Sequence, residues 1–182
     1  MRGPRCADRK LGKTSMQSTI PVKDAVTLRS KVYDGDVEAI VRMHGEVYAE
    51  EYGFNEEFEQ YVTGPLAAFS KSPTDRERLW IAERGGKIVG CIAIVTAEPS
   101  VAQLRWFLVR PEARRSGLGW RLMKEAITFS RRRKYTTIIL WTVSLLTAAA
   151  HLYTKVGFRL VERIPGHKWG VDVVEERYEV QL

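Results

Sequence analysis

The sequence predicts an α/β protein built on a mixed, mostly antiparallel sheet of about seven strands flanked by about four helices. Its 182 residues fit one domain, which is large enough to bury a core without disulfides or metals. A composition of 45% hydrophobic and 28% charged residues is typical of globular proteins. Segments with alternating apolar residues are interleaved with segments of helical spacing, and this order sets the fold class.

The predicted strands are short runs rich in β-branched and aromatic residues, bounded by glycine, proline and polar residues. They cover residues 25–33, 78–84, 87–96, 101–109, 136–143, 158–164 and 171–182. Between the second and third of these runs stands Gly85-Gly86, which favours a two-residue turn with positive φ. These two strands are therefore expected to form a hairpin.

The predicted helices repeat apolar residues every three or four positions. They cover residues 34–53, 55–69, 117–133 and 144–156. Asp34 or Asp36 is expected to cap the first helix, Asn55 the second and Ser144 the fourth, because their side chains can accept bonds from free amides. Gly53 is expected to end the first helix.

The net charge of +7 is concentrated at the N-terminus, since residues 1–20 carry +4 of it. Residues 1–22 lack periodicity and are interpreted as a disordered leader or an expression remnant, followed by a single domain over residues 23–182. A basic tail on a nearly balanced domain differs from a basic groove, so a nucleic-acid partner is not expected.

Other function classes are disfavoured by composition. No run approaches the roughly 18 apolar residues of a membrane span, and the N-terminus has no apolar secretory segment. Two cysteines make no disulfide framework and suit a cytoplasmic protein. The three scattered histidines and two cysteines do not have the spacing of a metal site, so no metal is expected.

The segment from Leu108 to Met123 is the most informative, because a strand leads through a loop with two arginines and two glycines into an amphipathic helix. Glycines allow close approach to the backbone, and the first amides of a helix lack internal partners, so a pyrophosphate could bind here. A plain turn with solvated arginines is the alternative for this segment alone. It matches no Walker loop, which would have Lys-Ser/Thr at Trp120-Arg121.

The run from Arg114 to Gly119, Arg-Arg-Ser-Gly-Leu-Gly, resembles the acetyl-CoA loop of the GNAT superfamily of N-acetyltransferases, Arg/Gln-x-x-Gly-x-Gly/Ala. A second family feature, Leu152-Tyr153-x-x-x-Gly157-Phe158, follows at the expected distance. The resemblance covers residues 25–182 and implies a GNAT-like fold, acyltransferase activity and acetyl-CoA as cosubstrate.

More narrowly, the segments 44–53, 80–83 and 140–142 resemble the acetyltransferase half of bacterial proteins that fuse a MarR-type DNA-binding domain to a GNAT domain. No such DNA-binding domain is present, so the resemblance implies a stand-alone bacterial version. A homodimer is left open.

The resemblance also implies which residues contact acetyl-CoA. They are Phe107, Leu108, Val109, Arg114, Arg115, Ser116, Gly117, Leu118, Gly119, Trp120 and Thr142. Transfer is expected to be direct: a primary amine attacks the thioester carbonyl while backbone N–H groups of residues 105–109 stabilise the oxyanion. Cys91, in the middle of an apolar strand, is interpreted as a core residue and not a nucleophile.

Tyr153 is the candidate general acid, which the resemblance places where it can protonate the departing thiolate. The alternative is a half-buried aromatic residue that packs its helix. Candidate proton acceptors for the amine are His44, Tyr48 and Glu51, which lie at helical spacing and could share one face. The sequence does not choose among them, and His167 is a weaker acceptor-site candidate.

From Met43 to Ser70 there are six glutamates and no Lys or Arg. If this segment lines the acceptor side, it would attract a cationic amine; a solvated acidic face is the alternative. Trp80 and Trp141 are expected in the core. The rival function is a catalytically silent CoA-binding sensor or partner-docking module, and the amine itself is not specified.

Overall fold

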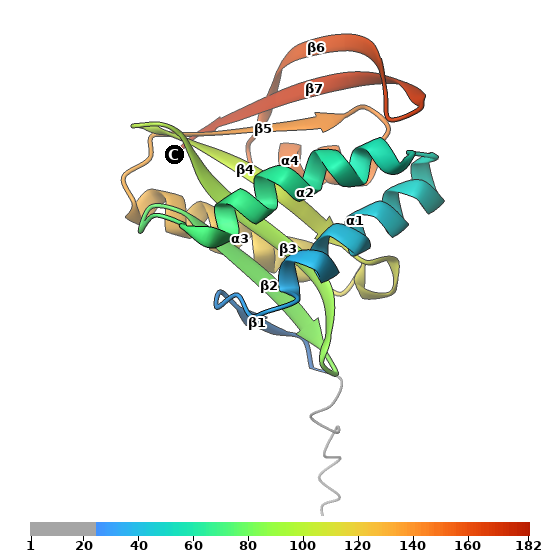
Figure 1. Ribbon diagram of the computed structural model, residues 1–182. Helices are drawn as coiled ribbons and strands as arrows, with labels where there is room; N and C mark the ends of the chain where they lie inside the picture. Colours follow the sequence, from blue (N-terminus) through green and yellow to red (C-terminus); the bar gives the residue numbers. More distant parts are fainter. Residues whose placement is uncertain (1–24) are drawn as a thin grey trace, which may run out of the picture.

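A mixed sheet of seven strands forms the centre of the protein, and four α-helices pack against it (Figure 1). The computed structural model describes residues 25–182. The strands are β1 (Thr27–Arg29), β2 (Arg78–Arg84), β3 (Lys87–Glu98), β4 (Val101–Val109), β5 (Thr137–Val143), β6 (Arg159–Lys168) and β7 (Val171–Gln181). The helices are α1 (Asp36–Tyr52), α2 (Glu56–Lys71), α3 (Leu118–Arg132) and α4 (Thr147–Lys155), with a 3-10 turn η2 at Pro111–Ala113. The predicted fold class is confirmed.

The strand order is β1-β2-β3-β4-β5-β7-β6. All neighbours are antiparallel except β4 and β5, which pair in parallel from Val101–Thr137 to Leu104–Leu140. This parallel pair joins an antiparallel meander, β1 to β4, to a second antiparallel group, β5 to β7. The expected leader over residues 1–22 lies outside the described residues.

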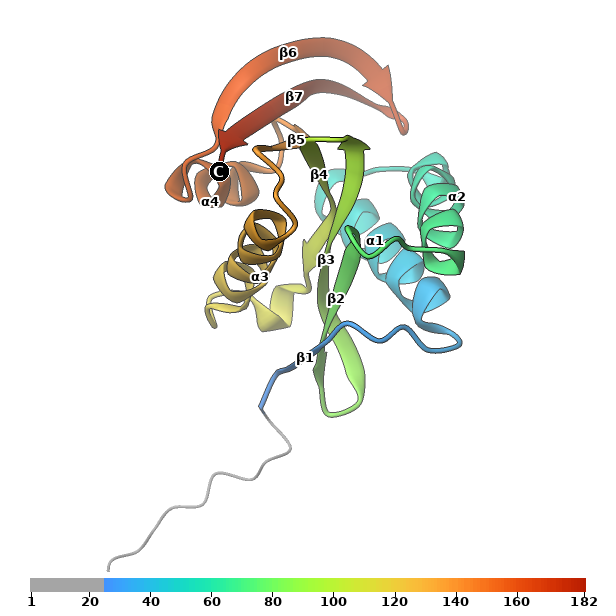
Figure 2. The same cartoon turned by 90° about the vertical axis from the view of Figure 1, so that its left-hand side faces the viewer.

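The helices cover the two faces of the sheet in pairs, α1 and α2 on one face and α3 and α4 on the other (Figure 2). Each pair buries an apolar stripe against the sheet. Ile40 and Met43 of α1 are fully buried in one core cluster, and Leu122 and Met123 of α3 are fully buried in the other. Burial of this kind stabilises the fold by roughly 1.5–3 kcal/mol for each large side chain.

The start of α1 differs from the prediction. Gly35, at φ 87°, occupies the N-cap position, and neither Asp34 nor Asp36 caps the helix. The Asp36 carboxylate instead accepts the N–H of Tyr33 at 2.6 Å and pairs with Arg29 at 2.7 Å. Arg29 also pairs with Glu83 of β2, so Asp36 fastens α1 to the edge of the sheet. The ion pair lowers the pKa of Asp36 against the opposing effect of burial.

Two other predicted helix ends have opposite outcomes. Asn55 caps α2 as expected, since its Oδ1 accepts the N–H of Glu57 at 3.1 Å, and Gly53 ends α1 with φ 72°. Ser144 is not a cap, because its N–H donates to Val174 O at 2.9 Å and α4 begins only at Thr147. A turn after β5 therefore occupies the point where the fourth helix was predicted to begin.

The β6–β7 hairpin is longer than predicted and arches away from the rest of the sheet (Figure 1). Pro165 lies within β6, where it is tolerated because β6 is the edge strand. The tip of the hairpin reaches the link between α1 and α2, where the Asn55 N–H donates to Trp169 O at 2.9 Å. His167, predicted in a loop, lies in β6 and pairs with Asp172 on the surface.

Of the residues expected in the core, Trp80 and Cys91 are buried as predicted. Trp141 is not, because 37% of its surface is exposed beside a cavity. In the part of the chain that the structure describes, no helix is long and apolar enough to cross a bilayer.

Candidate functional site

The site begins where β4 and β5 separate. Their last paired residues are Leu104 and Leu140, yet β4 continues to Val109 and β5 to Val143. The two strands therefore diverge over their final residues, and a gap opens between parallel strands at the centre of the sheet. Two neighbouring cavities lie at this gap.

A β-bulge in β4 accompanies the separation. Cys91 of β3 lies opposite Leu108 and Ala93 lies opposite Arg105, so two residues of β4 face Ile92 alone. Trp106, one of these two, has φ 48°, a left-handed conformation that is uncommon outside glycine. The Cys91 thiol donates to the Trp106 carbonyl at 3.0 Å, which fixes the bulge from the β3 side. Burial raises the pKa of Cys91, so the thiol stays protonated.

The first cavity, which we call the loop cavity, has a volume of about 420 Å³ and lies between the end of β4, the loop before α3, and α4. It is lined by Tyr48, Tyr52, Phe107, Leu108, Val109, Arg114, Arg115, Gly119, Leu146, Ala148, Ala149 and Leu152. Three residues of the motif that resembles an acetyl-CoA loop, Arg114, Arg115 and Gly119, therefore line this cavity.

The backbone of this loop is free to bind an anion. The N–H groups of residues 115–120 have no hydrogen-bond acceptor among residues 25–182, and the first helical bond is donated by Arg121 to Gly117 O. Arg115 at φ 57° and Gly117 at φ 80° turn the loop so that α3 begins without a side-chain cap. A run of free amides at a helix N-terminus suits a pyrophosphate.

The two loop arginines have different roles. Arg114 donates from Nε to Val109 O at 3.0 Å and pairs with Glu51 at 2.8 Å, so its charge is already partly balanced. Arg115 forms no ion pair with a described residue and is the cation that remains for a bound anion. The Ser116 hydroxyl donates to Ala113 O at 2.7 Å and holds the loop against η2.

The glycine positions fit the acetyl-CoA expectation. A Cβ at Gly119 would point into the loop cavity, 3.4 Å from Leu152 Cδ2 and 3.5 Å from Phe107 Cζ. A Cβ at Gly117 would meet no atom within 4 Å, so space above the loop is open. Leu118 is buried in the core, and Trp120 is exposed beside Lys155; neither side chain lines the loop cavity.

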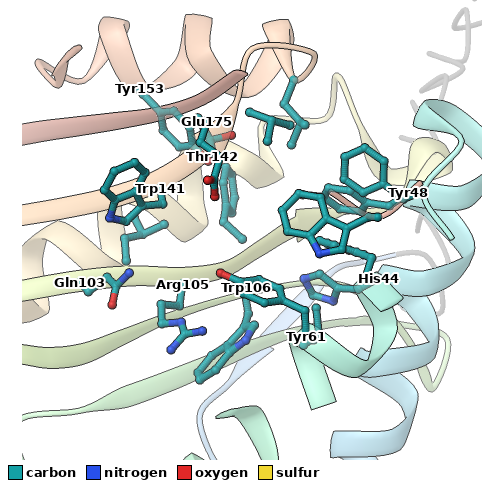
Figure 3. Close-up of a pocket in the computed structure, with 18 residues that line it drawn as sticks. His44, Tyr48, Tyr61, Gln103, Arg105, Trp106, Trp141, Thr142, Tyr153 and Glu175 are labelled. Carbon is teal, nitrogen blue, oxygen red and sulfur yellow. The ribbon is translucent and has the colours of Figure 1, made fainter. Parts of the chain in front are cut away.

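The second cavity, which we call the aromatic cavity, has a volume of about 110 Å³ and lies beside α1 and α2 (Figure 3). Its walls come from α1, α2, β4, β5, α4 and the β6–β7 hairpin. They are His44, Tyr48, Phe54, Phe58, Tyr61, Val62, Gln103, Leu104, Arg105, Trp106, Phe107, Trp141, Thr142, Val143, Leu146, Tyr153, Trp169 and Glu175. Thr142, expected to contact the cofactor, lines this cavity and not the loop cavity.

The two cavities share three residues, Tyr48, Phe107 and Leu146. These side chains mark the junction at which groups held in one cavity would meet groups held in the other. Tyr153 lines the aromatic cavity, and its ring centroid lies 6.1 Å from that of Phe107. The candidate general acid is therefore beside the junction.

Tyr153 is 4% exposed, and burial raises the pKa of its hydroxyl well above the usual value near 10. The hydroxyl therefore stays protonated, as a proton donor requires. Tyr48 is also buried with a raised pKa, in part because Tyr153 lies close to it. The junction thus has two protonated phenols, one from α1 and one from α4.

His44 is 3% exposed, and burial lowers its pKa to about 4. Its ring is therefore neutral at physiological pH, and the 2.8 Å contact of Nδ1 with the Ile40 carbonyl places the proton on Nδ1, because a carbonyl only accepts. Nε2 then has a free lone pair, and it is buried with no hydrogen-bond partner among the described residues. Of the predicted proton acceptors, His44 and Tyr48 line the aromatic cavity.

Glu51 does not line either cavity and instead pairs with Arg114. The six glutamates between Met43 and Ser70 all stand outside the lining of the aromatic cavity, and Glu46 pairs with Arg110 at 3.0 Å. The expectation of an acidic acceptor wall is wrong in its residues. The same segment does form a wall, but with its aromatic side chains.

Sequence reasoning missed several residues of the aromatic cavity, among them Arg105, Tyr61, Trp169 and Glu175. Trp169 packs against Phe54, Phe58 and Tyr61 with ring centroids 5.0, 5.1 and 5.4 Å away. The available signal is the recurrence of apolar residues at positions 58, 61 and 62, which predicts one apolar face of the second helix. Within residues 25–182, no group of three potential ligands could hold a metal ion.

Comparison with known proteins relates the sequence and the fold to acetyltransferases. The sequence profile of the Acetyltransferase (GNAT) family matches residues 40–158. An uncharacterized N-acetyltransferase from Schizosaccharomyces pombe is 29% identical over 119 residues, which are 63% of this chain and 72% of the yeast protein. N-acetylaspartate synthetase from Xenopus tropicalis is 32% identical over 89 residues, 48% of this chain and 33% of its own length.

The rat N-acetyltransferase family 8 member 3 is 33% identical over 85 residues, 44% of this chain, and the chain spans 37% of that relative. Among solved structures, a putative acetyltransferase from Salmonella typhimurium with its cofactor acetyl-CoA has a TM-score of 0.70 at 18% identity, covering 87% of this chain and 94% of its own. A ribosomal-protein-alanine N-acetyltransferase from Brucella melitensis has a TM-score of 0.68 at 20% identity, covering 86% and 99%. These structural likenesses show the fold.

Proposed function

The chain belongs to the Acetyltransferase (GNAT) family and is an acyltransferase, and we propose that it moves the acetyl group of acetyl-CoA to a primary amine by direct attack. The observation that carries the proposal is the meeting of two differently built cavities at the gap between β4 and β5. One offers free backbone amides for a pyrophosphate, and the other offers an unprotonated nitrogen for an amine.

The loop cavity would hold acetyl-CoA, which supplies an activated acetyl thioester when bound. The amides of residues 115–120 and the Arg115 guanidinium would bind the pyrophosphate. Phe107, Leu108 and Val109 would border the arm that leads to the junction. Backbone N–H groups on the splayed part of β4, residues 105–109, would stabilise the oxyanion that develops on the carbonyl.

Two side chains would move protons. His44 Nε2 would accept a hydrogen bond from the amine and take its proton as the C–N bond forms. A ring with a pKa of about 4 is a weak base, which is sufficient because a nitrogen becomes far more acidic as it is acylated. The Tyr153 hydroxyl would give a proton to the departing thiolate, and its raised pKa keeps that proton in place until then.

Glu51 would act on the loop through Arg114 and not on the amine. We also propose that residues 23–182 work as one catalytic domain, in a bacterial cytoplasmic protein that resembles the acetyltransferase half of MarR–GNAT fusions.

The second candidate function is a CoA-binding sensor or docking module without catalysis. The two are separated by measuring thiol release from acetyl-CoA over a panel of amines, with calorimetric titration of acetyl-CoA in parallel. We expect at least one amine to release thiol in proportion to enzyme. Tight binding of acetyl-CoA with no thiol release from any amine would favour the sensor.

A further inference from the structure

The charge of the aromatic cavity is informative about the acceptor. Two charged side chains line it, Arg105 from β4 and Glu175 from β7, while His44 is neutral. The Glu175 carboxylate is already balanced, because Lys168 Nζ donates to it at 2.6 Å. Arg105 has no ion pair or side-chain hydrogen bond with a residue in the described range 25–182. One uncompensated positive charge therefore stands at the wall.

Arg105 is held in place by packing and not by polar partners. Its guanidinium carbon lies over the Trp106 ring, 4.7 Å from the ring centre, in a cation–π contact. This contact leaves the N–H groups of the guanidinium available as donors, and two parallel N–H groups on one edge match a carboxylate. Gln103, two residues earlier on the same strand, lines the cavity beside it.

The rest of the cavity is flat and apolar. Tyr48 and Phe58 stack with ring centroids 4.3 Å apart, and Trp169 closes over Phe58 and Tyr61 from the hairpin tip. These rings come from α1, α2 and the β6–β7 hairpin, so the surface is held by three separate elements. Aromatic surfaces of this kind favour another ring or a flat apolar group.

We propose that the acceptor is a small amine that also carries a carboxylate and a flat apolar side group, the chemistry of an aromatic α-amino acid. The carboxylate is bound by the free edge of Arg105, and the side group lies among Tyr48, Phe58, Tyr61 and Trp169. The amine is then directed to the junction of the two cavities. This inference rests on the proposed function, which it narrows to one substrate class.

The structure disfavours two other acceptors. A diamine would bring a second positive charge next to Arg105, and the acidic side chain in the lining is already paired with Lys168. The N-terminus of a protein has no carboxylate on the carbon that bears its amine, so it would leave Arg105 unpaired. Both kinds of acceptor are therefore included in the panel of amines that tests the inference.

The test compares phenylalanine with 2-phenylethylamine, which differ only in the carboxylate, at saturating acetyl-CoA. A charge-assisted pair with Arg105 should raise kcat/KM for phenylalanine about 10- to 100-fold over the amine. Alanine, which keeps the carboxylate and lacks the ring, should be poorer than phenylalanine. A diamine of similar length, 1,5-diaminopentane, and a short peptide with a free N-terminus complete the panel.

Arg105→Met removes the charge and keeps an apolar chain over Trp106, and it should abolish the preference for phenylalanine. Arg105→Lys should restore part of it. Arg78→Met is the matched control, because the Arg78 guanidinium also lies 4.7 Å from an aromatic ring, that of Phe129, far from the cavity. It should leave the preference unchanged.

Three results would overturn the inference while leaving acetyl transfer in place. They are an equal kcat/KM for phenylalanine and 2-phenylethylamine, a preference for the diamine or the peptide, and a preference for phenylalanine that survives Arg105→Met. Calorimetric titration of phenylalanine into the CoA-bound protein measures binding independently of turnover. We expect binding heat with the wild type and none with Arg105→Met. Absence of that heat also overturns the inference, whereas binding without any thiol release counts against the proposed function alone.

Discussion

The loop cavity and the aromatic cavity meet at Tyr48, Phe107 and Leu146, yet they are built in opposite ways. The loop cavity takes its anion-binding groups from the backbone of one continuous segment, residues 115–120. The aromatic cavity is made of side chains from α1, α2, β4, β5, α4 and the β6–β7 hairpin, which span residues 44–175. Under the proposed function, one short motif would bind the cofactor, while selection of the acceptor would depend on the assembled fold.

The largest effect is expected at the junction itself, where the two cavities must act together. Tyr153→Phe keeps the ring and its contacts with Phe107 and Phe158 and removes the hydroxyl. If this hydroxyl protonates the thiolate, kcat should fall about 10²–10⁴-fold. The dissociation constant of acetyl-CoA, measured by calorimetry, should stay the same.

Tyr48→Phe is the comparison, because Tyr48 is also buried, has a raised pKa and lies at the same junction. Its effect on kcat should be much smaller than that of Tyr153→Phe. A larger loss in Tyr48→Phe would transfer the role of acid from α4 to α1.

The next largest effect should separate the loop cavity from its neighbour. Gly119→Glu would place bulk 3.4 Å from Leu152 and a negative charge beside the expected pyrophosphate. Like charges in contact cost several kcal/mol, so acetyl-CoA should bind about a hundredfold or more weakly. The control is Gly64→Glu, which adds the same charge to α2 where a Cβ meets no atom within 4 Å. Equal acetyl-CoA affinities in the two variants would remove the loop from the cofactor site.

A smaller effect concerns the pH dependence of the free energy of unfolding, to which His44 of the aromatic cavity should contribute. His44 has a pKa of about 4 in the folded protein and about 6.5 when unfolded, so the unfolded chain binds the extra proton between these values. Its contribution to stability is therefore complete above about pH 6.5 and is lost as pH falls toward 4. Between pH 8 and pH 5 the free energy of unfolding should drop by about 2 kcal/mol on this account.

The measurement is urea unfolding of the wild type and of His44→Asn at both pH values. Asparagine can still donate to the Ile40 carbonyl but does not titrate, so this part of the pH dependence should vanish. The same pH response in both proteins would mean that His44 is not held neutral by burial.

Much of the fold could be predicted from the sequence because its signals are local. Asn55 and Gly53 mark helix ends by their own side-chain or backbone chemistry, and both predictions hold. Asp36 was misjudged because its partner, Arg29, lies in a separate strand and outcompetes the local cap. The prediction for Ser144 is wrong because a turn follows β5 and delays the start of α4 to Thr147.

The same distinction applies to the site. The position of Arg115 and Gly119 beside one cavity could be predicted because a single loop contains both residues. Arg105 and Trp169 could not, since their roles depend on the bulge in β4 and on where the β6–β7 hairpin docks. The six glutamates leave two alternatives in the sequence, an acidic acceptor wall or a solvated face, and only the folded helices decide, because they turn their aromatic face inward and leave the carboxylates outside the cavity.

The central claim is that the loop cavity binds acetyl-CoA and the aromatic cavity binds the amine. Its most direct test is a kinetic comparison of Gly119→Glu with Trp169→Gly, in which glycine accepts the φ of 52° and keeps the carbonyl that bonds Asn55. Loss of the Trp169 ring should raise the acceptor KM about two- to tenfold and leave the acetyl-CoA KM unchanged. Gly119→Glu should raise the acetyl-CoA KM and leave the acceptor KM unchanged. If the KM for acetyl-CoA and the KM for the acceptor both rise in either variant, the two substrates do not bind in separate cavities and the claim is wrong.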